Sequence, residues 1–199
     1  MKRRMDVQPI VDKCFPLIEQ YSQTPHVEME LRLGKYNGNF FDTDVGRERW
    51  ERILAGLRQY DQWESAFVTQ SDSYYNDANS VRITVDASTG TQTMVQKVRA
   101  AQEDFIQSDS PVDVRFSVST ETPMTGQYEM DRKLVKLRHS FVRKNLRIDM
   151  TQVTGIKDMD SEEPTSYQIE LEILDPSKIQ YTEEFYNMVW KINNLLELL

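Results

Sequence analysis

Polar and apolar residues alternate along several stretches of the chain, with the period of two that is typical of β-strands. In each stretch, apolar residues occupy one face and polar or charged residues the other. The regular stretches are 27–33, 80–86, 112–121, 135–141, 146–151 and 167–173, and a less regular one is 93–99. About seven or eight strands without regular strand–helix alternation favour an antiparallel sheet or barrel over a parallel sheet.

Other stretches repeat their apolar residues at helical spacing. One such stripe lies within 50–57, and a second lies within 182–199. Residues 6–21 predict a short helical segment that is interrupted at Pro9 and Pro16. Because each stripe needs an apolar partner surface, we expect two or three helices to pack against the strands.

The first and last regular strands carry paired carboxylates on their polar faces. Glu28, Glu30 and Arg32 share one face, and Glu170 and Glu172 share another. If these faces meet, the carboxylates repel one another and their pKa values rise, unless a cation lies among them. A divalent metal ion with oxygen ligands is the simplest such cation.

Two arrangements of the strands satisfy the alternation. In an ordinary sandwich, the apolar faces form the core and the polar faces meet water. In a curled sheet, the polar faces line the inside and helices cover the apolar outside; eight closed strands leave room for side chains or one small ligand. Paired glutamates on separate strands favour the second arrangement. We therefore expect a mainly β (α+β) fold, a closed eight-stranded antiparallel β-barrel with helices outside, in one domain over 1–199.

Composition narrows the classes of function. The 199 residues carry a net charge of −8, which argues against a general nucleic-acid coat. Residues 132–147, however, hold seven Lys or Arg and no acid, a pattern that fits either a defined phosphate site or a solvated strand pair. The single cysteine, Cys14, fits a reducing intracellular compartment. No apolar run is long enough to span a membrane, so no membrane partner is expected.

Short motifs carry a resemblance over about residues 26–174. In chain order they are Glu28-x-Glu30-x-Arg32, Arg82 in Val-Arg-Ile-Thr, Lys97 in Val-Gln-Lys-Val-Arg, Arg115-x-Ser-x-Ser-x-Glu121, Lys136-x-Arg138, Arg147-Ile-Asp149-Met-Thr151 and Glu170-x-Glu172. This order resembles the triphosphate tunnel metalloenzymes, and most closely the metal-dependent RNA 5′-triphosphatases of fungal and viral mRNA capping. Leu134 and Gln168 depart from that family, which often has a basic residue and a third acid at these places.

The resemblance implies a hydrolase that cleaves the β–γ phosphoanhydride bond of 5′-triphosphate-ended RNA and also hydrolyses free NTPs. Mg²⁺ or Mn²⁺ would bind Glu28, Glu30 and Glu172, with Glu170 as a direct or more distant ligand. Glu121 would orient or deprotonate the attacking water, and Asp149 and Thr151 would support the cations or the water. The residues expected to bind phosphate are Arg32, Arg82, Lys97, Arg115, Lys136 and Arg138. All of them except Arg115 are also expected to have catalytic roles.

The resemblance further implies a partner, an RNA guanylyltransferase in cis or in trans, and action in the nucleus or in a virus-infected host cell. The sequence indicates no oligomeric state. Two alternatives stay open. One is a tunnel enzyme that acts on inorganic tripolyphosphate or thiamine triphosphate. The other is a non-catalytic module that binds polyphosphate or RNA ends, although pure anion binding has no need for so many acids.

Overall fold

The computed structural model describes residues 4–158, 161–162 and 165–199. Within these residues, strands dominate and three α-helices accompany them. The elements are α1 (Gln8–Tyr21), β1 (Val27–Tyr36), β2 (Phe41–Asp42), α2 (Arg47–Gln59), β3 (Ser65–Asn76), β4 (Val81–Asp86), β5 (Gln92–Phe105), β6 (Asp113–Pro123), β7 (Arg132–Arg143), β8 (Leu146–Asp158), β9 (Ser161–Glu162), β10 (Ser166–Ile173), the 3-10 helix η1 (Pro176–Lys178) and α3 (Thr182–Glu197).

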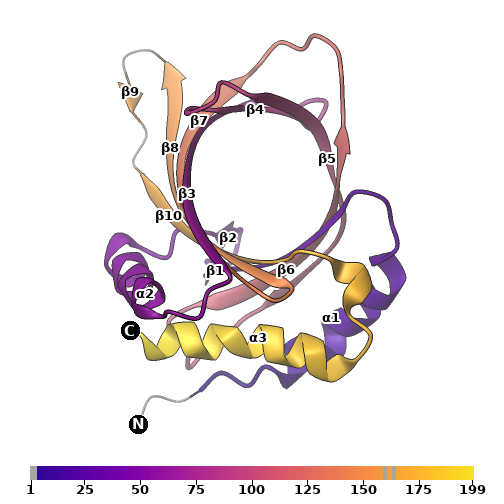
Figure 1. The fold of residues 1–199 in the computed structure, drawn as a ribbon, viewed down its shortest axis with the longest axis vertical. Helices are drawn as coiled ribbons and strands as arrows, with labels where there is room; N and C mark the ends of the chain where they lie inside the picture. The colour runs from indigo at the N-terminus through magenta and orange to yellow at the C-terminus, as the bar shows by residue number, and fades with distance from the viewer. Residues whose placement is uncertain (1–3, 159–160, 163–164) are drawn as a thin grey trace.

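Eight of these strands form a closed barrel (Figure 1). Their order is β10–β1–β6–β5–β4–β3–β7–β8, every pair is antiparallel, and pairing between β8 and β10 closes the ring. The short strands β2 and β9 pair with β1 and β8, respectively, and are not members of this ring. The predicted eight-stranded antiparallel barrel is therefore confirmed.

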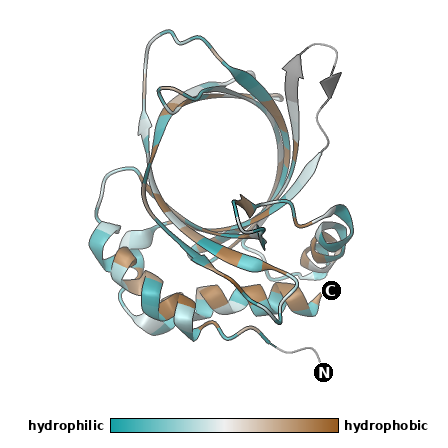
Figure 2. Ribbon diagram, turned by 180° about the vertical axis from the view of Figure 1, so that it is seen from behind, coloured by the Kyte–Doolittle hydropathy of each residue, from teal (hydrophilic) through white to brown (hydrophobic). Residues whose placement is uncertain are grey.

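The helices lie on the outside of the barrel, gathered on one side of it (Figure 1). The core fills the space between them and the strands: Phe116 of β6, for example, meets Phe185 of α3 edge-on, with ring centroids 5.8 Å apart. Figure 2 shows hydrophobic colour along the helices and along the strands that cross above them. Across the described residues, no helix combines the length and the hydropathy that a membrane crossing requires.

Alternation decides which side chains enter the barrel. On β1, Met29 and Leu31 point outward and are at most 1% exposed beneath the helices, whereas Glu30 between them points inward. The same alternation runs along β6, β8 and β10, where apolar residues join the outer core. The interior of the barrel is consequently a tunnel lined by polar and charged side chains.

Three local features differ from the sequence-based expectation. Helix α1 is one continuous helix that contains Pro16, rather than a segment broken by its prolines. Its apolar face, with Ile10, Val11 and Ile18 at most 1% exposed, supplies burial that offsets the backbone hydrogen bond missing at Pro16. Strand β3 was not predicted, and β5 continues to Phe105, well past the expected stretch.

Candidate active site

Cross-strand pairing brings the acidic residues of the two ends of the chain onto one wall of the tunnel. Glu30 of β1 lies opposite Glu172 of β10, and Arg32 lies opposite Glu170. Glu28 follows on the same face of β1, two residues before Glu30. Glu30 and Glu170 are only 5% and 7% exposed, so their carboxylates are held away from bulk water.

Basic residues of β4 and β5 extend toward this wall. The Nζ of Lys97 lies 2.9 Å from Glu28 and 3.2 Å from Glu121. Arg82 donates a hydrogen bond to Glu121 at 2.8 Å. The Nε of Arg82 is buried and has no hydrogen-bond partner. An unsatisfied buried donor costs about 1–3 kcal/mol, so this N–H fits a site that receives an anion.

A third group of charges links β7 and β8. Arg138 donates to the hydroxyl of Thr151 at 3.2 Å and lies 3.5 Å from Asp149 and 3.7 Å from Glu170. Asp149 is fully buried and accepts a hydrogen bond from the Nε of Arg147 at 2.9 Å. Asp149 and Thr151 therefore hold the guanidinium groups in place.

Lys136 lies on the same face of β7 and is oriented by a residue that the sequence analysis missed. Its Nζ donates a hydrogen bond to the hydroxyl of Tyr75 at 2.9 Å. The guanidinium of Arg132 lies 4.2 Å from the centre of the Tyr75 ring and is bound in turn by Asp77 at 3.0 Å. Burial lowers the pKa of Lys136, whereas the contact with Tyr75 raises it. The alternation of Ser71, Ser73 and Tyr75 could have revealed this face.

The carboxylates of the tunnel have strongly shifted pKa values. Burial, a hydrogen bond with Glu121 and the nearby Glu30 raise the pKa of Glu28 to about 9. Burial raises the pKa of Glu172 to about 7, although Arg147 opposes the change. Burial would also raise the pKa of Glu121, but its hydrogen bond with Glu28 and the charges of Arg82 and Lys97 lower it to about 2. The crowded acids would thus gain from an additional cation.

These acids fit a divalent metal ion in chemistry, but their present contacts are with basic side chains. Among the described residues, no three or more Asp, Glu, His or Cys side chains are grouped as a metal-binding cluster. Lys97 contacts Glu28, Arg147 contacts Glu172, and Arg32 lies 3.0 Å from Glu30 and 2.7 Å from Glu170. The donor set consists of carboxylate oxygens, which hard divalent ions prefer.

Arg115 differs from the other predicted phosphate ligands. Its guanidinium makes two hydrogen bonds to Asp104 of β5, at 2.7 and 2.8 Å, and lies 4.6 Å from the centre of the Phe41 ring. Its charge is therefore balanced by an acid outside the carboxylate cluster. Asp104 was not found from the sequence, because the second half of β5 was not predicted.

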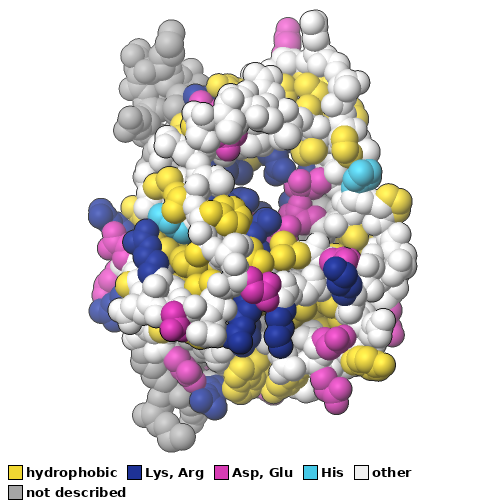
Figure 3. Space-filling view, viewed as in Figure 1, with side chains coloured by type: hydrophobic (Ala, Val, Ile, Leu, Met, Phe, Trp, Pro, Cys, Tyr) yellow, Lys and Arg dark blue, Asp and Glu magenta, His cyan; other side chains and the backbone are white. Residues whose placement is uncertain are grey.

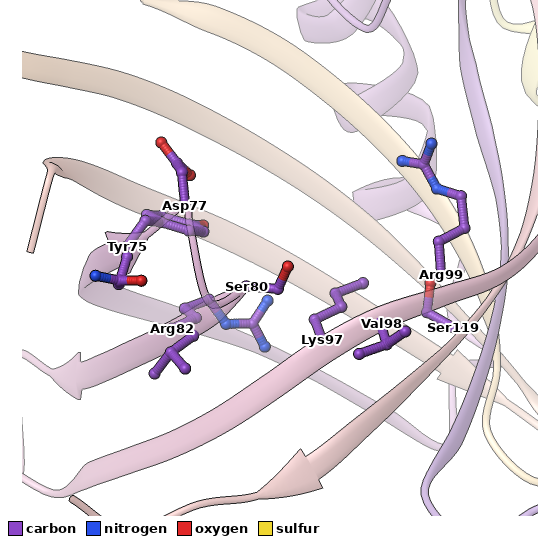
Figure 4. Close-up of a pocket in the computed structure, with 10 residues that line it drawn as sticks. Tyr75, Asp77, Ser80, Arg82, Lys97, Val98, Arg99 and Ser119 are labelled. Carbon is purple, nitrogen blue, oxygen red and sulfur yellow. The ribbon is translucent and has the colours of Figure 1, made fainter. Parts of the chain in front are cut away.

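The tunnel is open to solvent, and both acidic and basic side chains surround its opening (Figure 3). One pocket of about 380 Å³ reaches Arg82 and Lys97 from the turn between β3 and β4. Figure 4 shows these two side chains between Tyr75 on one side and Arg99 on the other. The volume of this pocket is in the usual range for a small-molecule site, roughly 300–1,000 Å³.

The closed antiparallel barrel and its charged interior define a protein of the triphosphate tunnel class. Residues 57–198 match the family described as mRNA capping enzyme, beta chain. The chain belongs to this family, the RNA triphosphatases of mRNA capping, and is a hydrolase that acts on the RNA 5′-triphosphate.

Solved structures of low sequence identity share the fold. The chain is similar to the Schizosaccharomyces pombe Pct1 RNA triphosphatase, with a TM-score of 0.74, 16% identity, and coverage of 98% of this chain and 91% of that one. For Pct1 in complex with the Spt5 CTD, the TM-score is 0.74 at 17% identity, with 99% and 95% coverage. For the Mimivirus capping enzyme triphosphatase, it is 0.65 at 15% identity, with 96% and 98% coverage. No curated protein matches the chain.

Proposed function

We propose that this chain is a metal-dependent RNA 5′-triphosphatase that cleaves the β–γ bond of 5′-triphosphate-ended RNA and also hydrolyses free NTPs. The observation that carries the proposal is the meeting of Glu30 and Glu172 on directly paired strands inside a closed tunnel, with Lys97 and Arg82 adjacent. A solvated sheet face has no reason to bury so many charges together.

In this proposal, Glu28, Glu30 and Glu172 hold Mg²⁺ or Mn²⁺, with Glu170 as a direct or more distant ligand. The fit is supported by the raised pKa values of Glu28 and Glu172, since a cation offsets the crowding of anions. When bound, the divalent ion would neutralise charge on the phosphate oxygens.

The basic residues would bind the phosphate chain. Arg82 offers an unsatisfied buried N–H, and Arg138 offers a planar guanidinium that suits phosphate oxygens. Lys97 and Lys136 act as point charges, each held in place by a partner on a neighbouring strand, Glu121 of β6 and Tyr75 of β3 respectively. Arg32 keeps its position through Glu30 and Glu170, and Arg115 contributes through the field of the tunnel.

Glu121 would position the attacking water. Because its pKa is near 2, the carboxylate stays ionised and accepts a hydrogen bond from the water without retaining its proton. Oxygen of the water forms a bond to the γ-phosphorus while the bond from that phosphorus to the β–γ bridging oxygen breaks. The products are a diphosphate RNA end and inorganic phosphate, which together take up the two protons of the water.

We extend the proposal to the whole chain, residues 1–199, as a single tunnel domain. The diphosphate end suits an RNA guanylyltransferase as the next enzyme, acting in cis or in trans, in the nucleus or in an infected host cell. The buried thiol of Cys14 is compatible with a reducing compartment.

The test uses purified full-length protein with three substrates: γ-labelled triphosphate-ended RNA, ATP and tripolyphosphate. Each is incubated with Mg²⁺, with Mn²⁺ or with EDTA. Metal-dependent release of γ-phosphate from RNA is the expected result. Faster turnover of tripolyphosphate than of RNA would identify tripolyphosphate as the substrate, and binding without any turnover would contradict an enzymatic function.

A further inference from the structure

A rim of the tunnel carries a cation that the chemistry described above does not use. Strand β4 begins at Val81, which pairs with Gln96 of β5, so no β4 residue lies beside β5 from Val98 onward. Arg99 lies on this unpaired part of β5, directly before an irregularity in the pairing with β6. It lines the 380 Å³ pocket that reaches inward to Arg82 and Lys97 (Figure 4).

Arg99 differs from the other basic residues of the pocket because its charge is not balanced. Lys97 contacts Glu28 and Glu121, and Arg82 contacts Glu121. The side chain of Arg99 is exposed and forms no hydrogen bond or ion pair with the residues that the structure describes. The acid that also lines the pocket, Asp77, is bound to Arg132.

The position of Arg99 along β5 gives its distance from the inner site. Lys97 and Arg99 lie on the same side of the strand, two residues apart, which corresponds to about 7 Å. The pocket joins Lys97 and Arg82 to solvent, so a phosphate chain held by these two residues would have a way out of the tunnel through it. Whatever follows the triphosphate then passes Arg99.

We propose that Arg99 binds the first internucleotide phosphate of a single-stranded RNA and so makes the enzyme favour RNA over mononucleotides. The proposal rests on the proposed function and names the path of its substrate. A free NTP has no phosphate beyond the triphosphate, so it gains nothing from Arg99. An RNA chain gains one charge contact, and this contact is weakened by salt.

The test compares substrates that differ in the number of internucleotide phosphates: GTP with none, a 5′-triphosphate dinucleotide with one, and a 5′-triphosphate decamer. For Arg99→Ala, the ratio of kcat/KM on the dinucleotide to that on GTP is expected to fall roughly fivefold, as suits one exposed phosphate contact. For the decamer, Arg99→Ala should lower the ratio of kcat/KM to that on GTP by the same factor. The salt dependence of kcat/KM on the decamer should be smaller than in wild type. Arg99→Lys should restore most of the ratio, since lysine also binds phosphate.

Arg143→Ala is the matched control. Arg143 is also an exposed arginine, but it lies at the end of β7 that pairs with the start of β3, away from the β3–β4 turn. Arg143→Ala should leave kcat/KM unchanged for all three substrates. If GTP is a poor substrate, its inhibition constant against RNA gives the same comparison.

Three results would overturn the proposal about Arg99: an equal loss on GTP and RNA, no loss on the dinucleotide, or the same loss in Arg143→Ala. A wild-type enzyme that cleaves RNA while Arg99→Ala keeps its RNA-to-GTP ratio would reject only this inference. Wild-type protein that releases no phosphate from any of the three substrates would reject the proposed function itself.

Discussion

Lys97 shows how closely the charges inside the tunnel depend on one another. Its Nζ lies 2.9 Å from Glu28, 3.2 Å from Glu121 and 4.0 Å from Glu30. Removing one member of a buried charge group leaves the others without compensation. For a carboxylate of this group, the loss of repulsion from neighbouring acids offsets part of that cost, so its substitution is expected to change function more than folding.

The first prediction concerns the acids that would hold the metal. Glu30→Ala and Glu172→Ala should each lower γ-phosphate release at least about 100-fold, a loss of the size reported for removing one group that stabilises the transition state. Each should also weaken Mn²⁺ binding measured by calorimetry. The folded structure should persist, because losing one of several crowded carboxylates relieves repulsion.

Glu51→Ala is the control for these variants, since Glu51 pairs with Arg47 on the exposed face of α2. Near-normal turnover in Glu30→Ala or Glu172→Ala would remove that residue from the metal site. Loss of the far-ultraviolet circular dichroism signal would instead assign it a role in folding.

The second prediction concerns pH and Tyr75. The hydroxyl of Tyr75 raises the pKa of Lys136, which burial lowers. Tyr75→Phe should therefore lower this pKa further, so that Lys136 loses its charge at a lower pH. Because the charged form binds phosphate, the alkaline limb of the profile of kcat/KM against pH should move to lower pH, with little change at neutral pH.

Tyr74→Phe provides a control on the same strand. Tyr74 faces outward and meets Lys133, whose Nζ lies 5.4 Å from the ring centre, so a comparable pair exists outside the tunnel. Its removal should not move the alkaline limb. A shift of equal size in both variants, or a shift to higher pH in Tyr75→Phe, would contradict a positioning role for Tyr75.

Helix α1 shows burial prevailing over local propensity at the scale of an element. Pro16 lies in the interior of the helix on an exposed position, where it removes a hydrogen bond without filling the core. Pro16→Ala should raise the free energy of unfolding by about 2 kcal/mol. Proline costs about 3 kcal/mol in a helix interior, but it also restricts the unfolded chain, and losing that restriction offsets part of the gain. Urea unfolding would measure this.

Pro9→Ala tests the explanation, because Pro9 lies in the first turn of α1, where the missing N–H has no helical partner anyway. Pro9→Ala should leave the free energy of unfolding unchanged or lower it slightly. Equal gains in both variants would contradict the explanation, because only Pro16 removes a hydrogen bond from the interior of the helix.

The strands could be predicted from the sequence to the extent that one face of each is buried against helices. The stretches 27–33 and 167–173 were found because apolar residues that enter the core alternate with charged residues. Strand β3 was missed because its outward face carries Gln70 and Asp72, which the helices gathered below the ring do not cover (Figure 1). In β5, the irregularity after Arg99 interrupts the period of two.

The residues of the candidate site were predicted where their strand was predicted and missed where it was missed. Residues on recognised strands, such as Glu28 and Arg138, were placed on the polar face from alternation, and their roles stay proposals. Tyr75 and Asp104 were missed because β3 and the end of β5 were missed. Their contacts with Lys136 and Arg115 depend on pairings between strands, which no local pattern contains.

Closure of the barrel is a property of the whole molecule that alternation cannot supply. A polar face turned inward has the same period as a polar face turned to water, so the pattern alone fits both a sandwich and a tunnel. The pairing of β8 with β10 completes the ring and buries the acids. The apolar stripes of the helices indicated the correct choice, because only a barrel with an apolar exterior offers them a surface.

The last prediction concerns the stability of the whole barrel. A cation that binds the folded tunnel and not the unfolded chain should raise the melting temperature, because binding removes folded protein from the unfolding equilibrium. At a Mn²⁺ concentration of about 100 times Kd, the gain of about 2.7 kcal/mol corresponds to roughly 5–10 °C for a chain of this size. EDTA should reverse the increase, and Glu172→Ala should abolish it. An increase of equal size in wild type and Glu172→Ala would show that the ion binds elsewhere, whereas no increase at any Mn²⁺ or Mg²⁺ concentration would contradict a metal site among these carboxylates.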